Sequence, residues 1–320
     1  MPSSTTKITA QNYNDIQENV HSILGNTTSN SPQTGYGNLV ISDQWVPVPG
    51  EDKITAQMYE DLYIDIVRTR IHQVGAENFT IDPFVIGDKE NNVNAQKIDL
   101  NYLLGLEGLV AAMETDKHLV HSSQVEEVLY FTETRTSGWN QQIVHEFKLT
   151  WDDADHRRHY FNAGGKIRIS AELAGDASSK GSDWASVLDY GSLDFAFNDT
   201  FQIEGATTTG LGKWGNYNMP SSSYSLLFNA YAAVYSPNLY TIEAADVDNT
   251  SIKFRITFDD ANSGFGSGGA DIDEPVLGTT SSQISAIKPW GEVDINGTMR
   301  DTVKVNEPTY TVLTNLSSGS

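Results

Sequence analysis

Two nearly identical heptapeptides constrain this sequence more than any other feature, because each one opens a helical pattern. They read Lys7-Ile8-Thr9-Ala10-Gln11-Asn12-Tyr13 and Lys53-Ile54-Thr55-Ala56-Gln57-Met58-Tyr59, and their first residues are 46 positions apart. In each copy the threonine can accept hydrogen bonds from the free amides of a first helical turn. Apolar residues then follow at helical spacing, and Gly25 or Gly75 can end the helix. We therefore expect capped helices over residues 7–25 and from about residue 55 to residue 75.

A third helical pattern runs from about residue 94 to residue 113. Two faithful copies and one degenerate copy do not make a solenoid, which usually needs at least three repeats. Enzymes seldom begin with a duplicated helix start, whereas assembly proteins often do. The apolar faces of the first two helices supply eight candidates for helix packing or for subunit contacts: Ile8, Tyr13, Ile16, Val20, Ile54, Tyr59, Leu62 and Ile66.

From residue 122 the sequence becomes rich in β-branched and aromatic residues. We expect a hairpin of strands 125–136 and 143–151, and further strands at 39–41, 166–173, 193–203, 224–235, 239–246, 251–259 and 276–287. Short helices are expected at 152–162 and 182–188, and a mobile polar tail from Ser317. The sequence therefore predicts an α+β fold, with a helical region of repeated capped helices over residues 1–121 and an antiparallel β-sandwich-like domain over residues 122–320.

The composition narrows the classes of partner. The chain has 320 residues, with 20 basic and 42 acidic ones and a formal net charge of -22. Such a surface repels phosphate backbones, so nucleic-acid binding is not expected. The absence of cysteine removes disulfides, thiolate nucleophiles and iron–sulfur clusters. No apolar run is long enough to span a membrane, and the first residues lack the apolar core of a signal peptide.

Two acidic loops are the best candidates for a metal site. Oxygen ligands alternate in Asp246-Val247-Asp248 and in Asp271-Ile272-Asp273, as they do in calcium loops. The first loop lacks the glycine and distal glutamate of an EF-hand, and the second occurs once. A solvated acidic loop explains each pattern better, so we predict no metal and no cofactor. Asp152 to Asp155 similarly fit the start of a helix, where acidic side chains offset the helix dipole.

No catalytic signature stands out in the sequence. It contains no Gly-x-Ser-x-Gly elbow, no Gly-x-x-x-x-Gly-Lys loop and no His-Glu-x-x-His helix. We therefore predict that the protein is not an enzyme. Aromatic residues of the second half could stack on sugars, although core packing is the better explanation for Trp184, Trp214, Tyr217, Tyr224 and Trp290.

Several segments resemble a family of virion structural proteins of tailed phages, especially contractile-tailed, cyanophage-like ones. The resemblance covers roughly residues 7–290. It rests on the two heptapeptides, on Asp65-Ile66-Val67-Arg68-Thr69-Arg70-Ile71-His72-Gln73-Val74-Gly75, on Tyr160-Phe161-Asn162-Ala163-Gly164-Gly165-Lys166-Ile167-Arg168 with Asp183-Trp184 after it, and on Asn238-Leu239-Tyr240-Thr241-Ile242 and Phe254-Arg255-Ile256-Thr257-Phe258.

This resemblance implies a non-enzymatic particle component, and together with the two-part organisation of the chain it favours the tail or neck over the capsid shell. Its partners would be other virion proteins and copies of itself. It would be found in the virion, after assembly in the host cytoplasm without a signal peptide. Three alternatives stay open: a receptor- or carbohydrate-binding module of the tail-fibre type that recognises a host surface glycan, a capsid decoration protein, and, least favoured, an envelope-degrading hydrolase.

Overall fold

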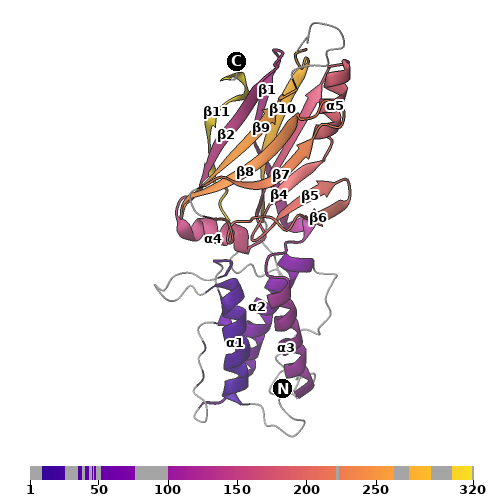
Figure 1. The fold of residues 1–320 in the computed structure, drawn as a ribbon. Helices are drawn as coiled ribbons and strands as arrows, with labels where there is room; N and C mark the ends of the chain where they lie inside the picture. Colours follow the sequence, from indigo (N-terminus) through magenta and orange to yellow (C-terminus); the bar gives the residue numbers. More distant parts are fainter. Residues whose placement is uncertain are drawn as a thin grey trace. The chain divides into compact units, whose positions relative to one another are not determined.

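The computed structural model describes residues 9–25, 35–37, 40–42, 45, 47, 52–75, 100–220, 223–262, 274–289 and 305–318. They form two compact units. The helical unit holds the described residues up to Glu126, together with residues 158–164, Pro289 and Val305. The β unit is built from three stretches of chain, residues 127–157, 165–288 and 306–318. The fold is α+β, with helices in the first unit and two antiparallel sheets in the second (Figure 1).

The duplicated heptapeptide does start two helices. The helical unit contains α1 (Ala10–Leu24), α2 (Ala56–Val74) and α3 (Leu100–Thr115). Thr9 and Thr55 are the N-caps of α1 and α2, and each threonine oxygen accepts the backbone N–H three residues later. Helix α2 has 19 residues and α1 has 15, so the second copy has been extended by one helical turn. None of the described helices has the length and apolar character needed to cross a membrane.

The three helices run parallel to one another. At their N-terminal ends, the ring of Tyr13 on α1 meets the ring of Tyr59 on α2, 5.5 Å between centroids. At their C-terminal ends, the Gln73 amide of α2 donates to the Met113 carbonyl of α3 at 2.9 Å. Short loops join antiparallel helices, whereas a parallel neighbour requires the chain to return along the bundle. This requirement explains why the two heptapeptides lie so far apart in the sequence.

Most of the eight heptapeptide candidates pack within the helical unit. Ile54 is half-buried and Ile8 lies outside the described residues. The other six are buried: Tyr13, Ile16, Val20, Tyr59, Leu62 and Ile66. Their side chains are occupied inside one chain, so subunit contacts would have to use other residues.

Helix α2 also buries a polar face, which holds the connector that follows α1. The Asp65 carboxylate accepts the backbone N–H groups of Ile41 and Ser42 at 3.1 and 2.8 Å, and the Ser42 hydroxyl at 2.7 Å. Gln73 at the other end of α2 donates to the Tyr36 hydroxyl. Burial raises the pKa of the Asp65 carboxyl, and the hydrogen bonds from Ser42 and Ile41 act against that rise. The strand expected at residues 39–41 is therefore wrong for Val40 and Ile41, because this connector pairs with a helix side chain and not with a strand.

The β unit is a two-layered, sandwich-like structure. One sheet has the order β1-β10-β3-β4-β5-β6 and the other has the order β11-β2-β9-β8-β7. The strands are β1 (Val125–Arg135), β2 (Gln142–Thr150), β3 (Lys166–Ala174), β4 (Ser192–Phe195), β5 (Thr200–Glu204), β6 (Thr207–Gly210), β7 (Ser225–Tyr231), β8 (Leu239–Asp248), β9 (Ser251–Asp259), β10 (Thr279–Pro289) and β11 (Thr309–Thr314). Short helices α4 (Ala154–Asn162) and α5 (Ser179–Leu188) lie where the sequence predicts them.

The expected hairpin of residues 125–136 and 143–151 is wrong, because its two strands belong to different sheets. Strand β1 pairs with β10, whereas β2 pairs with β9 and β11. The intervening loop carries the chain from one layer to the other, and Trp139 in that loop pairs its backbone with Val276. The Trp139 side chain is buried, so the loop is held by the core and not by a tight turn.

Three further expectations change in detail. Residues 193–203 form β4 and β5, two short strands that pair with each other. Strand β11 lies in a segment where no strand was expected. Ser317 and Ser318, expected in a mobile tail, belong to a short 3₁₀ helix, Leu316–Ser318, whose first side chain is fully buried.

Aromatic side chains fill the space between the two sheets. Phe254 on β9 stacks on Phe147 of β2, 5.2 Å between ring centroids, and meets Phe195 of β4 edge-on at 5.3 Å. The first contact lies within one sheet and the second joins the two sheets. Alternation along β2 and β9 puts these rings on the inner face and mostly polar or charged residues on the outer face.

Replacing Asp65 with alanine tests the role of the polar face of α2. The change leaves two buried backbone donors and one hydroxyl without their acceptor, so we expect the free energy of unfolding to fall by about 2–4 kcal/mol. Urea unfolding followed by circular dichroism at the helical signal measures it. Asp15→Ala on the exposed face of α1 is the matched control, and we expect it to change stability by less than about 0.5 kcal/mol. Equal effects of the two substitutions would contradict a role for Asp65 in holding the connector.

Candidate functional site

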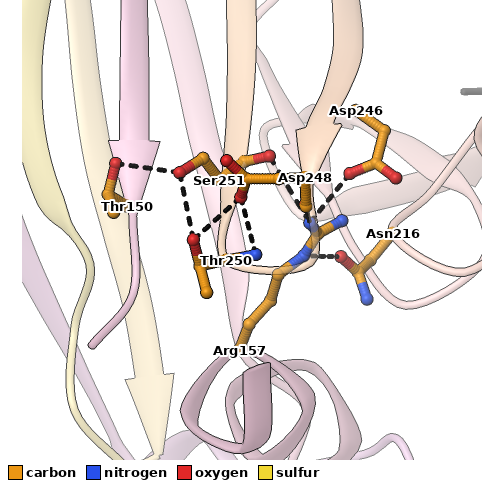
Figure 2. A network of polar contacts seen from close by, with 7 residues as sticks. All are labelled: Thr150, Arg157, Asn216, Asp246, Asp248, Thr250 and Ser251. Atoms are coloured by element: carbon orange, nitrogen blue, oxygen red, sulfur yellow. Dashed lines mark hydrogen bonds and ion pairs between the residues drawn. The ribbon is translucent and has the colours of Figure 1, made fainter. Parts of the chain in front are cut away.

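A buried arginine organises the polar cluster drawn in Figure 2. Arg157 lies in α4, and its guanidinium donates to the Asn216 side-chain oxygen and to the Asp246 carboxylate, both at 2.8 Å (Figure 2). It also donates to the backbone carbonyl of Asp248 at 2.6 Å. The guanidinium lies 6.0 Å from the centre of the Trp151 ring. One planar side chain thus fastens a helix, a loop and the β8–β9 turn together.

The turn itself is closed by its own side chains. The Asp248 carboxylate accepts the backbone N–H and the hydroxyl of Thr250, each at 2.8 Å. Ser251 lies next to Thr150 on the neighbouring strand, with 3.2 Å between their hydroxyl oxygens. The hydrogen bonds from Thr250 hold the pKa of the Asp248 carboxyl below its usual range.

The first calcium candidate is therefore engaged by protein groups. Asp246 forms an ion pair with Arg157, and Asp248 closes a turn. The second candidate pair, Asp271 and Asp273, lies outside the described residues. Across the described stretches, no three histidine, aspartate or glutamate side chains converge as a metal ion would require. The metal hypothesis gains no structural support from the residues that can be placed.

The acidic segment before α4 acts as a helix start, as the sequence indicates. The Asp153 carboxylate accepts the His156 backbone N–H at 2.8 Å, and it lies 3.0 Å from the His156 ring nitrogen. This arrangement satisfies a free amide of the first helical turn. The second histidine of the segment, His159, belongs to the helical unit, where its ring lies against Gly37. The two histidines are therefore not brought together at one site.

A second polar chain crosses the core of the β unit. The His145 ring on β2 contacts the Ser282 hydroxyl on β10 at 3.0 Å and the Tyr310 hydroxyl on β11 at 2.8 Å. A serine, a histidine and a tyrosine connected in this way suggest nucleophilic chemistry, but His145 and Ser282 are fully buried between the sheets. Burial lowers the pKa of His145 to about 4, so the ring is neutral at physiological pH. This series of hydrogen bonds therefore links the two sheets and does not face a substrate.

Two open grooves on the β unit are candidate ligand sites among the described residues. The larger, of about 740 Å³, lies between β3, β10 and α5. It is lined by small and hydrogen-bonding side chains, among them Ser170, Glu172, Ser186, Asp189 and Gln283. The lining also contains Leu173 and Leu188, and the volume is within the range of small-molecule sites. Its hydroxyl, amide and carboxylate groups match the hydrogen-bonding needs of a polyhydroxylated ligand.

The smaller groove, of about 490 Å³, lies on the outer face of the other sheet. Strand register places Glu146, Arg255 and Glu243 side by side on three adjacent strands. The Arg255 guanidinium lies 3.7 Å from the centre of the Tyr224 ring, and the Tyr224 hydroxyl donates to Glu146. These side chains are paired with one another, so the second groove offers fewer free groups than the first.

The aromatic residues considered for sugar stacking are divided by the structure. Trp184 is fully buried, and Tyr224 is covered by Arg255. Trp214 and Tyr217 are exposed in the loop after β6, while Trp290 lies outside the described residues. Core packing is therefore correct for Trp184, and among the rings that the structure describes, stacking stays open for Trp214 and Tyr217.

Sequence reasoning missed the organising residues of these sites. Arg157 appears in the sequence only as part of a short basic cluster, and nothing near it indicates that residues 216 and 246 are its partners. A weak signal exists for Lys180, which precedes Trp184 by one helical turn and so shares its buried face.

Comparison with known proteins identifies no relative of this chain: no family model, no curated protein and no solved structure matches it.

Replacing Arg157 with methionine tests whether its hydrogen bonds hold the polar cluster of Figure 2 together. The variant leaves Asp246 and two carbonyls without their donor in a largely buried place, so we expect a loss of about 2–3 kcal/mol in unfolding free energy. Arg157→Lys should recover only part of this loss, since a single ammonium group cannot reach all the partners that the planar guanidinium contacts. Denaturant unfolding followed by tryptophan fluorescence measures both. Lys213→Met, at an exposed position of the same unit, is the control. A comparable loss of stability in that variant would contradict the stabilising role of Arg157.

The buried histidine predicts how stability depends on pH. His145 has a pKa of about 4 in the folded chain and an ordinary value of 6.5 when unfolded. Between these values the unfolded state binds a proton that the folded state does not, so stability falls as pH falls from 6.5 toward 4. We expect His145→Gln to flatten the pH dependence by about 1.4 kcal/mol per pH unit in this window. Urea unfolding at several pH values measures the slope; His156→Gln is the control for replacing a histidine near the surface.

Proposed function

We propose that this chain is a non-enzymatic structural subunit of a tailed-phage particle, associated with the tail or neck, which acts by binding copies of itself and other virion proteins. The particle assignment rests on the sequence resemblance. The observation that carries an assembly role is the apolar character of the edge strands in the β unit.

Three of the four edge strands expose large apolar side chains. Leu129 lies on β1, Tyr231 on β7, and Val312 and Leu313 on β11. Tyr231 is 64 % exposed. An edge strand presents unpaired backbone N–H and C=O groups, and monomeric proteins usually guard such edges with charge, proline or a bulge. Strands β7 and β11 each contain a bulge-type irregularity and β1 carries charged residues, but the apolar side chains exposed beside these features favour contact with another protein chain.

The polar clusters support a structural role as well. Arg157, Asp65 and His145 each form hydrogen bonds that join separate elements of one unit. They hold separate parts of the chain in fixed positions, which is what a subunit needs when its contacts with neighbours must be reproducible.

A second candidate function is the binding of a host surface glycan, as in a module of the tail-fibre type. The groove between β3, β10 and α5 favours it, because hydroxyl, amide and carboxylate groups converge there on a space of about 740 Å³. A capsid decoration protein also fits the exposed edges, and the resemblance does not separate it from a tail or neck component.

Lysine substitutions at the edges test the proposed assembly. We expect Leu129→Lys, Tyr231→Lys and Val312→Lys each to weaken self-association of the full chain by about tenfold, because a charged edge resists pairing. Analytical ultracentrifugation over a concentration series measures it. Val247→Lys is the matched control, since Val247 is exposed on the inner strand β8 and not at an edge.

Two results would contradict the proposal. One is a chain that stays monomeric at all concentrations and in the presence of particle proteins. The other is the absence of its peptides when purified phage particles from the source of the sequence are digested and analysed by mass spectrometry.

A further inference from the structure

A lysine and an aspartate meet inside the β unit with almost no access to solvent. Lys180 lies in α5, and Asp260 directly follows β9. The Lys180 Nζ atom lies 2.6 Å from the Asp260 Oδ2 atom. The two side chains are 1 % and 0 % exposed. Lysine and aspartate are almost never fully buried, so this pair requires an explanation.

Aromatic residues form the surroundings of the pair. Trp184 follows Lys180 by one helical turn, and Phe258 precedes Asp260 by two strand positions. Their ring centroids are 6.4 Å apart, and Trp139 packs against both rings. The Nζ atom also donates to the backbone carbonyl of Glu274 at 2.7 Å. The amine is thus held by two oxygen atoms, and the aromatic cluster begins one helical turn further along α5.

Burial makes the charged form of this pair costly. Removing an ammonium and a carboxylate from water costs several kcal/mol for each ion, and their attraction repays this cost only in part. Transfer of one proton from the amine to the carboxylate yields a neutral amine beside a neutral carboxylic acid, and a neutral amine is a nucleophile. The Asp260 carbonyl carbon is one C–O bond beyond Oδ2, so it lies at most about 3.8 Å from Nζ. That separation is close to the distance at which bound groups react.

We propose that Lys180 and Asp260 condense to an intramolecular isopeptide bond. After the first proton transfer, the Nζ lone pair attacks the Asp260 carbonyl carbon and the new C–N bond forms. A second proton passes from nitrogen to a carboxyl oxygen, the C–O bond breaks, and one water molecule leaves. The product is a neutral secondary amide. The step needs no oxidant and no co-reactant, because the ammonium supplies both hydrogens of the water.

The bond would tie α5 to the end of β9 and close the loop between residues 180 and 260. A covalent link of this kind stabilises a fold mainly by restricting the unfolded chain. The chain has no cysteine, so disulfides cannot supply such a link. An amide also resists reduction, so it persists both in a reducing cell and outside it. The inference concerns the β unit alone and does not depend on the proposed function.

The intact mass of the purified full-length chain tests the proposal directly. We expect a mass lower than the sequence mass by one water molecule. Digestion should then release a branched peptide in which the segment containing Lys180 is joined to the segment containing Asp260. Lys180→Arg and Asp260→Ala should each restore the full sequence mass. Asp260→Asn should still condense, but with loss of ammonia, which distinguishes reaction at this carbonyl from loss of water elsewhere.

A matched control exists in the same chain. Lys117 and Glu114 are also 2.6 Å apart, but both are exposed on the surface of the helical unit. We expect their peptides to stay unlinked, because water solvates both charges. A wild-type chain that keeps its full sequence mass after prolonged incubation in the folded state would overturn the proposal, whatever the variants do. So would a branched peptide that joins Lys117 to Glu114 as readily as Lys180 to Asp260.

Discussion

The helical unit depends on one constraint, the need to satisfy a polar face that α2 buries. Helix α2 packs apolar residues such as Leu62 and Ile66 against its neighbours, yet Asp65 is buried as well. A buried carboxylate is tolerated only where donors reach it, and the connector of residues 40–42 supplies three. The same connector must run along the bundle because α1 and α2 are parallel. The direction of the helices and the buried polar face therefore require each other, and the repeated heptapeptide begins both helices at the same end.

The β unit solves a different problem, because its strands come from three separate stretches of chain. Pairing within both sheets is antiparallel; the ladder of β2 with β9 is continuous, whereas the pairs β11–β2, β7–β8 and β8–β9 each contain a register shift. Contacts between the sheets are fewer and are made by particular side chains. His145 bridges to Ser282 and Phe254 packs on Phe195, while Arg157 fastens helix α4 to the β8–β9 turn of one sheet. The layers are thus joined by specific long-range contacts, which the local pattern of each strand does not contain.

This difference explains how much of the structure could be predicted from sequence. Capping threonines and helical spacing are local, so Thr9 and Thr55 were sufficient to locate α1 and α2. Alternation along a strand is also local, and it located β3, β8 and β9. The pairing of strands is not local: the predicted hairpin failed because Trp139 is drawn into the core and β1 turns to the other sheet. The candidate sites depend on contacts such as Arg157 with Asp246, 89 residues apart, so composition and spacing could not reveal them.

The last strand has a consequence for the order of folding. Strand β11 pairs with β2, and its Tyr310 hydroxyl completes the hydrogen bonds of His145. Strand β2 and its His145 are synthesised before Tyr310, which lies 165 residues further along the chain. Until then β2 is itself an edge, and one nitrogen of a buried histidine has no protein partner of this kind. The five-stranded sheet can therefore close only after residues 309–314 have been synthesised, so a nascent chain that still lacks them cannot offer the finished β11 edge to a neighbour.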